Sequence, residues 1–366
     1  MTEFAQDTLK PKADNPAAPR LLHWLPAAFL LAVVGLGAVV TLTSPGFQER
    51  VTGKDIITGT WQLSWEKGLD AKVPWRDPSV NLWGSMNYRL FAEARDGALV
   101  GKEGWLFTSE EYQTAAGDEA EIAAKVKYIS EVRDELAKDG AKLVVVLIPA
   151  KARVYSEDLS AQVPAQKAPV YASFRQSLTT AGIISPDLLA SFQAEKQKSS
   201  RDLFFRTDTH WTPEGAKVAA QTVALAVQEL APDLPPAEYA VQIKPATERR
   251  GDLLRYVPGP APDQVREGEY IRTDEGGGGL LGDETLAVTL VGTSYSADSK
   301  DNVWHFDDAL SQALKTEVLN AAQEGKGPIV PMREYLKSED RKNNPPRIVI
   351  WEIPERFLRV KYQETK

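Results

Sequence analysis

The chain has 366 residues, of which 43% are hydrophobic, so it is long enough to bury the core of one large domain or two small ones. A formal net charge of −8, with no cluster of basic or basic and aromatic residues, argues against nucleic acid as a partner. The absence of cysteine excludes disulfides, thiolate nucleophiles, Fe–S clusters and Cys-type zinc sites, and three histidines are too few for a histidine-rich metal site. We therefore expect neither a metal nor a cofactor.

The first informative segment is an uncharged run near the N-terminus. Residues 21–47 contain no Asp, Glu, Lys or Arg, and the run LPAAFLLAVVGLGAVVTL within them is apolar for long enough to cross roughly 30 Å of hydrocarbon as a helix. A cleaved signal peptide would have an apolar region of only about 7–15 residues and a clear small-x-small site. A buried core helix is disfavoured because Gly35 and Gly37 lower helix propensity and no polar face interrupts the run.

These features predict a single-pass membrane protein. The predicted order is a short cytoplasmic tail (1–20), a transmembrane signal anchor (21–43), a tether and domain edge (44–85) and the main domain (86–366). Charge supports this orientation only weakly, since the positive-inside bias close to the membrane depends on Arg20.

The pattern becomes regular after the tether, whose residues show no sustained periodicity. Two short apolar runs around a Gly-rich turn predict a β-hairpin over 97–109. Apolar residues at helical spacing then predict a helix over 119–139, followed by Gly140, and the continuous apolar run at 142–150 fits a buried strand. A helix followed by a buried strand is typical of α/β folds.

Two further buried strands are predicted, at 286–294 and 347–354, with helical stretches at 307–323 and 330–339. The expected architecture is α/β, with a parallel central sheet covered by helices on both faces. Residues 234–284, which are rich in Pro and Gly and include the GGGG run at 276–279, are expected to form a long irregular insertion near the functional site.

Ser294 is the first candidate catalytic residue. It follows the predicted strand 286–294 directly, and in open α/β sheets the ligand crevice lies at the carboxyl ends of the strands. A serine at such a turn, with Gly292 allowing a tight backbone, exposes its Oγ and directs backbone N–H groups toward a developing oxyanion. The alternative is an ordinary loop serine.

The segment DTHW, residues 208–211, favours the catalytic interpretation. A serine nucleophile needs an imidazole to accept its proton, and the imidazole needs a carboxylate on its other nitrogen. Asp208 and His210 supply both, and residues two apart in extended backbone point the same way. Thr212 and Pro213 then provide the N-cap and first position of a helix.

The other two histidines are weaker candidates. His305 follows Ser294 closely enough to line the same cleft, but a structural histidine is the favoured interpretation, and His23 lies at the start of the predicted span.

Five further residues are candidates for substrate binding. Lys151 and Arg153 follow a buried strand and are expected either to meet an anionic glycan or to form solvated ion pairs. Arg356 has the same two possibilities. Tyr295 and Trp211, beside the proposed nucleophile and base, are expected either to stack on a sugar ring or to pack beneath the site.

Seven motifs in the same order resemble the alginate O-acetyltransferases of the AlgJ and AlgX type, a branch of the SGNH-hydrolase-like proteins, over about 260 residues. These motifs are GKEGWLF, VVLIPAKARVY, FFRTDTHWTPEGA, GDLLRYVP, LVGTSYSAD, EGKGPIVPM and WEIPERFL. The resemblance implies a three-layer α/β/α fold and a periplasmic enzyme that acetylates an exopolysaccharide. It places the family's Asp–His pair on Asp208 and His210 and its nucleophile on Ser294, with the pair before the serine, as in this permuted branch.

The resemblance also implies partners, namely the polysaccharide acceptor, a membrane-bound acyl-transferring protein that supplies acetyl groups, and other subunits of the export complex. Because the chain carries an N-terminal apolar segment and no C-terminal carbohydrate-binding module after WEIPERFL, it resembles the membrane-anchored AlgJ type more closely. We therefore predict an O-acetyltransferase that acts through an acetyl-serine. Two alternatives remain: a polysaccharide deacetylase or esterase, and a non-catalytic scaffold subunit of the export complex.

Overall fold

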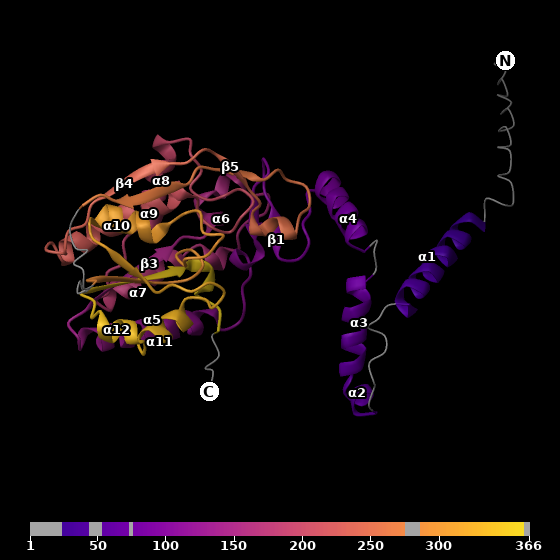
Figure 1. The fold of residues 1–366 in the computed structure, drawn as a ribbon, viewed down its shortest axis with the longest axis horizontal. Coiled ribbons are helices and arrows are strands. Elements are labelled where there is room, and N and C mark those ends of the chain that lie inside the picture. Colours follow the sequence, from indigo (N-terminus) through magenta and orange to yellow (C-terminus); the bar gives the residue numbers. More distant parts are fainter. Residues whose placement is uncertain (1–23, 44–52, 73–75, 275–285, 362–366) are drawn as a thin grey trace, which may run out of the picture. The chain divides into compact units, whose positions relative to one another are not determined.

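A computed structural model of the chain describes residues 24–43, 53–72, 76–274 and 286–361 (Figure 1). The chain divides into two compact units, Met1–Leu82 and Trp83–Lys366. The predicted tail and the GGGG run lie outside the described residues, and so does His23. The predicted domain boundary after residue 85 stays a prediction.

The first unit is helical. It contains α1 (Leu25–Leu42), α2 (Gly53–Thr58) and α3 (Thr60–Lys72), and α4 (Arg76–Phe91) continues into the second unit. These segments are helical although the sequence shows no sustained periodicity there, and their role as a tether and domain edge stays a prediction. Pro78 does not interrupt α4 because it occupies the first turn, where the backbone N–H groups have no partner within the helix.

The membrane span predicted over residues 21–43 stays a prediction. Across the parts of the chain that the structure describes, no helix combines the length and apolar character that crossing a bilayer requires.

A four-stranded parallel sheet forms the centre of the second unit. Its order is β3 (Lys142–Ile148), β10 (Ile348–Pro354), β8 (Val288–Val291) and β9 (Val318–Asn320). The predicted parallel sheet is thus confirmed, and three of its strands lie at the predicted positions. Because all strands run the same way, the residues that follow them meet at one edge of the sheet.

Helices cover both faces of this sheet (Figure 1). Successive residues of a strand point to opposite faces, so alternate side chains of β3 enter two separate cores. The helices of one core are α5 (Asp118–Ala137), α7 (Val170–Thr180) and α11 (Ile329–Tyr335). The helices of the other are α8 (Leu188–Lys198), α9 (Pro213–Leu230) and α10 (Phe306–Leu314). The predicted arrangement of helices on both faces is confirmed.

Two segments differ from the expected elements. The helix expected over 307–323 ends at Leu314, because Lys315 adopts a left-handed conformation (φ 54°, ψ 41°), and the chain then forms β9. The supposedly irregular insertion contains two antiparallel ribbons, one from β4 (Tyr239–Ile243) and β7 (Gly268–Arg272), the other from β5 (Thr247–Arg249) and β6 (Asp263–Val265).

The remaining elements are short. The predicted hairpin is confirmed as β1 (Ala98–Val100) paired with β2 (Leu106–Thr108). The others are α6 (Lys151–Val154), α12 (Glu339–Asn343) and the 3₁₀ turns η3 (Ser109–Glu111), η4 (Ser156–Asp158), η5 (Ala165–Lys167), η6 (Asp252–Arg255) and η7 (Glu355–Phe357).

Candidate active site

The two halves of the candidate site come from different elements of the fold. Ser294 follows β8, whereas His210 lies just before α9. The Thr212 Oγ1 accepts a hydrogen bond from the Gly215 N–H at 3.1 Å, with Pro213 at the first helical position, so the predicted helix start is confirmed.

Asp208, His210 and Ser294 form one chain of hydrogen bonds. The His210 Nε2 lies 2.8 Å from the Ser294 Oγ, and its Nδ1 lies 2.7 Å from the Asp208 Oδ1. The backbone N–H of His210 donates to the same carboxylate oxygen at 2.9 Å. The Asp208 side chain therefore fixes the orientation of the imidazole, which points its second nitrogen at the serine hydroxyl.

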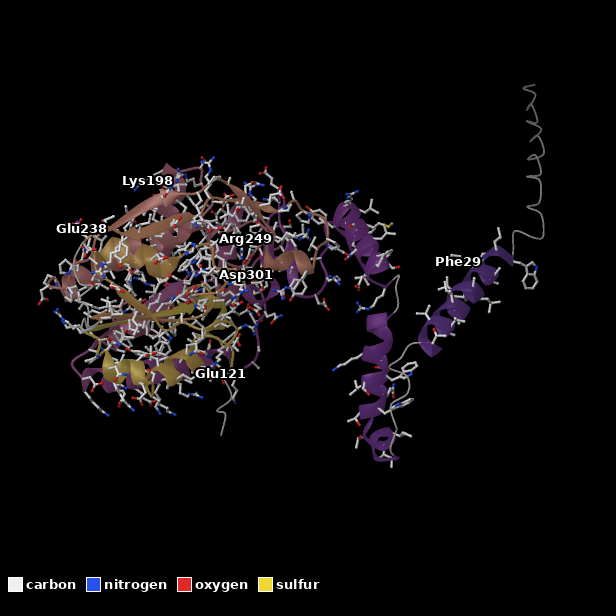
Figure 2. The ribbon with its side chains drawn as sticks, in the orientation of Figure 1. Phe29, Glu121, Lys198, Glu238, Arg249 and Asp301 are labelled. Carbon is white, nitrogen blue, oxygen red and sulfur yellow. The ribbon has the colours of Figure 1, made fainter. Side chains whose placement is uncertain are left out.

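Asp208 is fully buried and remains ionised because of its partners. Burial raises the pKa of its carboxyl group, but the hydrogen bond and charge of His210 and the charge of Arg249 outweigh burial and hold this pKa well below its usual range. The second oxygen, Oδ2, accepts from the Arg249 guanidinium at 3.2 Å and from the Asp252 N–H at 3.1 Å. Arg249 ends β5, so the inserted ribbon supplies the positive charge (Figure 2).

Two half-buried carboxylates also hold the backbone on either side of Asp208. The Asp252 carboxylate accepts from the Thr209 N–H at 2.8 Å and from the Thr209 Oγ1 at 2.6 Å. Asp263 accepts from the backbone N–H groups of Arg206 and Thr207, at 2.8 and 3.0 Å. The loop is thereby fixed before a substrate arrives.

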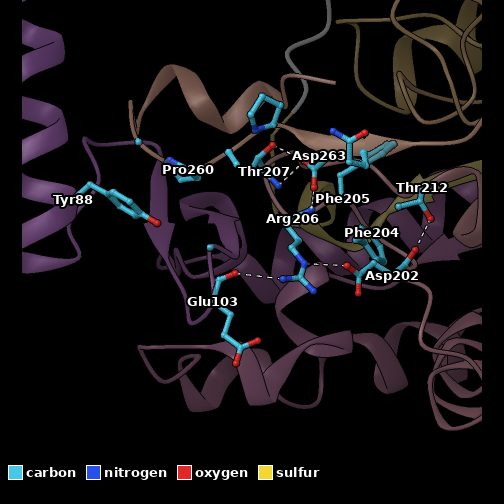
Figure 3. Close-up of a pocket in the computed structure, with 15 residues that line it drawn as sticks. Tyr88, Glu103, Asp202, Phe204, Phe205, Arg206, Thr207, Thr212, Pro260 and Asp263 are labelled. Atoms are coloured by element: carbon cyan, nitrogen blue, oxygen red, sulfur yellow. Dashed lines mark hydrogen bonds and ion pairs between the residues drawn. The ribbon is translucent and has the colours of Figure 1, made fainter. Parts of the chain in front are cut away.

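A cavity of about 540 Å³ lies beside this loop (Figure 3). The Arg206 guanidinium lines it and donates to Asp202 at 3.0 Å and to the Glu103 carbonyl at 3.4 Å. The Asp263 carboxylate also has partners, because it accepts hydrogen bonds from the backbone N–H groups of Thr207 and Arg206. Since these charged side chains already have partners within the protein, they do not favour binding of a charged ligand in this cavity.

Glu352 supports the turn that carries Ser294 and was not predicted from the sequence. It lies on β10, is fully buried, and accepts hydrogen bonds from the Thr293 N–H at 2.7 Å and the Ser296 Oγ at 3.1 Å. Burial raises the pKa of Glu352 to about 7, even though these hydrogen bonds lower it. The available signal was a single acidic residue within the apolar run IVIWEIP.

Aromatic rings pack against the His210 imidazole. The Trp304 ring stacks on it, with 4.5 Å between centroids and 9° between planes, and the Tyr295 ring lies 4.7 Å away at 50°. The Tyr295 hydroxyl donates to the Thr209 carbonyl, so this ring also ties the Ser294 turn to the His210 loop.

Three of the predicted substrate-binding residues lie beneath the site. Lys151, Tyr295 and Trp211 are at most 2% exposed, so they have almost no surface to offer a sugar. The Lys151 ammonium donates to three backbone carbonyls, those of Leu106, Arg206 and Asp208, at 2.6–3.0 Å. For these three, the expected contact with a glycan is corrected to packing and support of the catalytic loop.

Arg153 and Arg356 lie farther along the same edge of the sheet. Arg153 forms a two-point ion pair with Glu355, at 2.6 and 3.1 Å, which is the ion-pair alternative. The guanidinium carbon of Arg356 lies over the Tyr295 ring, 5.6 Å from its centre. A role for either residue in substrate binding stays a prediction.

His305 is not part of the chain of hydrogen bonds between Asp208, His210 and Ser294. Its ring nitrogens are 3.8 Å from Glu267 and 3.6 Å from Asp308, which agrees with the structural interpretation.

The ligand atoms of Asp208, His210 and Asp252 lie within 4.8 Å of one another, a spacing that could hold a metal ion. However, both nitrogens of His210 and both oxygens of Asp252 already have hydrogen-bond partners. The arrangement therefore favours proton transfer between side chains over metal binding.

Residues 98–355 match the family described as SGNH hydrolase-like domain, acetyltransferase AlgX. The chain is 40% identical over 316 residues to a probable alginate O-acetylase AlgJ of Pseudomonas syringae pv. tomato, a match that covers 83% of this chain and 80% of the relative.

Two solved structures resemble the fold. The O-acetyltransferase domain of Pseudomonas putida AlgJ superposes with a TM-score of 0.68 at 36% identity, covering 74% of this chain and 95% of that domain. Pseudomonas aeruginosa AlgX superposes with a TM-score of 0.55 at 25% identity, covering 72% of this chain and 63% of that protein. The resemblance predicted from the seven motifs is confirmed: the chain belongs to the AlgX family of acetyltransferases with an SGNH hydrolase-like domain.

Proposed function

We propose that this protein is an O-acetyltransferase that moves acetyl groups onto the hydroxyls of alginate or an alginate-like exopolysaccharide. The hydrogen-bonded series Asp208–His210–Ser294 carries the chemical part of the proposal, since it joins a nucleophile to a base and the base to a carboxylate. The similarity to proteins named probable alginate O-acetylase AlgJ supports the choice of reaction and acceptor. The motif order, with Asp208 and His210 before Ser294, is the proposed permuted arrangement.

The first step transfers acetyl from the donor to the enzyme. The His210 Nε2 removes the proton from the Ser294 Oγ, which attacks the carbonyl carbon of the donor's acetyl group. Asp208, ionised and hydrogen-bonded to Nδ1, stabilises the imidazolium. The tetrahedral intermediate then expels the donor's leaving group, which takes the proton from His210, and acetyl-Ser294 remains.

The second step repeats the same chemistry in the opposite direction. A hydroxyl of the polysaccharide gives its proton to His210 and attacks acetyl-Ser294, and the departing Ser294 oxygen regains the proton. Water at roughly 55 M competes for the acetyl-enzyme, so transfer needs a bound sugar hydroxyl with a much higher effective concentration, which well-placed groups reach at about 10⁵ M. An esterase would use the same residues with water as acceptor, and a scaffold would need none of them.

The proposed location is the periplasmic face of the inner membrane, with residues 21–43 as the anchor. The described helix α1 has 18 residues, or about 27 Å at 1.5 Å per residue, whereas the uncharged run continues to Phe47, beyond the described part of the chain. The large apolar side chains of α1, such as Phe29 and Leu31, are more than 70% exposed, which suits a lipid environment. The proposed partners are a membrane-bound acetyl supplier and other export-complex subunits.

The function is tested by complementation of a deletion strain with wild type or Ser294→Ala, followed by measurement of acetyl on the secreted polysaccharide. Acetylation is expected to vanish on deletion and to return only with wild type. If deletion instead raises acetylation, the protein removes acetyl groups and the esterase alternative holds. If Ser294→Ala restores acetylation fully, the protein acts as a scaffold.

A further inference from the structure

A cavity of about 290 Å³ lies at the same edge of the sheet as Ser294. Its lining comes from the residues that follow β3, including Arg153, and from those that follow β10, including Glu355 and Arg356. Because β3, β10 and β8 are parallel, these segments lie at the same edge of the sheet as Ser294, which follows β8. The volume is at the small end of known ligand pockets, about 300 Å³, and suits a sugar-sized group.

The charges around this cavity do not cancel. Arg153 and Glu355 neutralise each other through two hydrogen bonds. The Glu111 carboxylate accepts from the backbone N–H groups of Lys151 and Ala152, at 3.0 and 2.8 Å. Both acidic residues that line the cavity are therefore satisfied within the protein.

Arg356 differs from these three charged groups. Its side chain is only 10% exposed, yet its guanidinium makes no hydrogen bond to any residue in the described ranges, and its Nε is fully buried. Its nearest carboxylate, that of Glu110, is 3.6 Å away, beyond hydrogen-bond distance. A buried guanidinium N–H with no acceptor is costly unless a ligand supplies one, and the planar fork of the guanidinium matches a carboxylate.

The Arg356 guanidinium is also close to the catalytic base. Its central carbon and the His210 ring both contact the Tyr295 ring, at 5.6 and 4.7 Å between centres. Arg356 and His210 are thus separated by no more than the sum of these two distances. A second lining cation, Lys167, also has no side-chain hydrogen bond to a described residue.

We propose that this cavity is an acceptor subsite in which Arg356 binds the carboxylate of a hexuronic acid residue and so presents a hydroxyl of the polymer to acetyl-Ser294. The proposal rests on the proposed function for the identity of the acceptor. It assigns to Arg356 a role in choosing acidic over neutral polysaccharide. Arg153, whose guanidinium is engaged by Glu355, holds the wall of the subsite.

Binding of two matched acceptors tests this subsite without requiring catalysis. The full chain with Ser294→Ala is titrated calorimetrically with an oligosaccharide of hexuronic acid and with its carboxyl-reduced, neutral counterpart of the same length. The acidic oligosaccharide is expected to bind about 10- to 100-fold more tightly, the range expected for one charge-assisted hydrogen-bonded pair. Equal binding of the two would overturn the proposal before any change to Arg356.

Arg356→Gln is then expected to abolish the preference for the acidic ligand and to leave binding of the neutral one within about twofold. Arg359→Gln is the matched control, because it removes the same charge three residues later from a side chain that does not line the cavity. A retained preference in Arg356→Gln, or an equal loss in Arg359→Gln, contradicts the subsite. A structural role for Arg356 would weaken both ligands together and leave their ratio unchanged.

Arg356→Lys covers the case in which the glutamine variant does not fold. It keeps the charge but loses the two-point fork, so the preference should fall several-fold without disappearing. A preference equal to that of wild type would count against binding by the guanidinium. Acetyl transfer by the Ser294-containing enzyme is measured separately: if no acceptor is acetylated but the acidic preference depends on Arg356, the proposed function fails and the subsite stands.

Discussion

Each half of the site is held by a buried carboxyl group, but the pKa values of the two groups are shifted in opposite directions. Asp208 and Glu352 are both 0% exposed. The pKa of Asp208 is held well below its usual range, whereas burial raises that of Glu352 to about 7. The difference lies in their partners: Asp208 contacts His210 and the Arg249 guanidinium, whereas Glu352 accepts only from backbone N–H and hydroxyl groups.

This contrast suits the two tasks. In the proposed mechanism, the carboxylate behind His210 must stay charged, because it stabilises an imidazolium in each step. The carboxylate beneath Ser294 has only to hold a turn, and neutral hydrogen-bond donors suffice for that. Burial alone therefore says little about the charge of an acidic residue, and the neighbouring cations decide it.

The largest effect is expected when the carboxylate behind His210 loses its charge. Asp208→Asn should lower kcat for hydrolysis of a small acetyl ester by roughly 10³- to 10⁴-fold, because the amide cannot stabilise the imidazolium and favours the wrong tautomer. Glu352→Gln makes the equivalent change beneath Ser294 and should lower kcat far less. Equal losses in the two variants would remove the distinction between the two carboxylates.

The next effect concerns the source of the Asp208 charge. Arg249→Gln should raise the folded-state pKa of Asp208 and destabilise the protein by about 4 kcal/mol at neutral pH, since it removes one member of a buried ion pair. A depressed carboxyl pKa stabilises the fold above its unfolded value near 3.9, and this contribution is lost as pH falls through the folded pKa. The difference from wild type should thus shrink below about pH 4.

Chemical denaturation across pH measures this difference. Arg250→Gln is the matched control, because this neighbour is exposed. A destabilisation that does not change between pH 7 and pH 3 would show that Arg249 acts through packing on Trp304 and Phe205, not through its charge.

For Glu352, we expect a smaller contribution to folding stability that changes with pH in the opposite direction to that of Asp208. A folded pKa raised from 4.5 to about 7 means that the neutral carboxyl is favoured in the folded protein. Its stabilising contribution is complete below about pH 4.5 and is lost as pH rises through about 7, a change on the order of 3 kcal/mol. Glu352→Gln cannot ionise, so its unfolding free energy should fall less than that of wild type over this window.

The measurement is again denaturation at a series of pH values, with the exposed Glu339→Gln as control. Parallel curves for wild type and Glu352→Gln would contradict the raised pKa.

The sequence revealed the local parts of this site and missed the distant ones. Asp208 and His210 are two residues apart, and Ser294 follows a recognisable buried strand, so short-range pattern was enough to select them. Glu352 contacts Thr293 across 59 residues, and Arg249 reaches Asp208 across 41. Such contacts depend on strand order and on the inserted ribbons, and neither follows from local periodicity.

The fold shows the same division. Long apolar runs, such as those of β3 and β10, were identified close to their observed bounds. The three-residue strand β9 falls within the helix predicted over 307–323, because three residues are too few to establish a period and the left-handed Lys315 gives no glycine signal. Burial of Lys151 was likewise unforeseeable, since its three acceptors are carbonyls from two distant segments.

The smallest effect on kcat is expected from changes to the aromatic ring that packs on the face of the His210 imidazole. The hydrogen bond that His210 donates to Asp208 and the one it accepts from Ser294 fix it within the plane of its ring, whereas the stacked Trp304 ring restrains it from the side. Trp304→Phe keeps a flat ring and removes an Nε1 that has no hydrogen-bond partner among the described residues. It should lower kcat for a small acetyl ester only about two- to threefold, because each 1.36 kcal/mol of barrier is tenfold in rate and stacking contributes about 0.5–1.5 kcal/mol. Trp304→Leu removes the flat face and should cost about tenfold. If the two variants lose kcat equally while their melting temperatures match, the Trp304 ring only fills space, and in-plane hydrogen bonding alone orients the base.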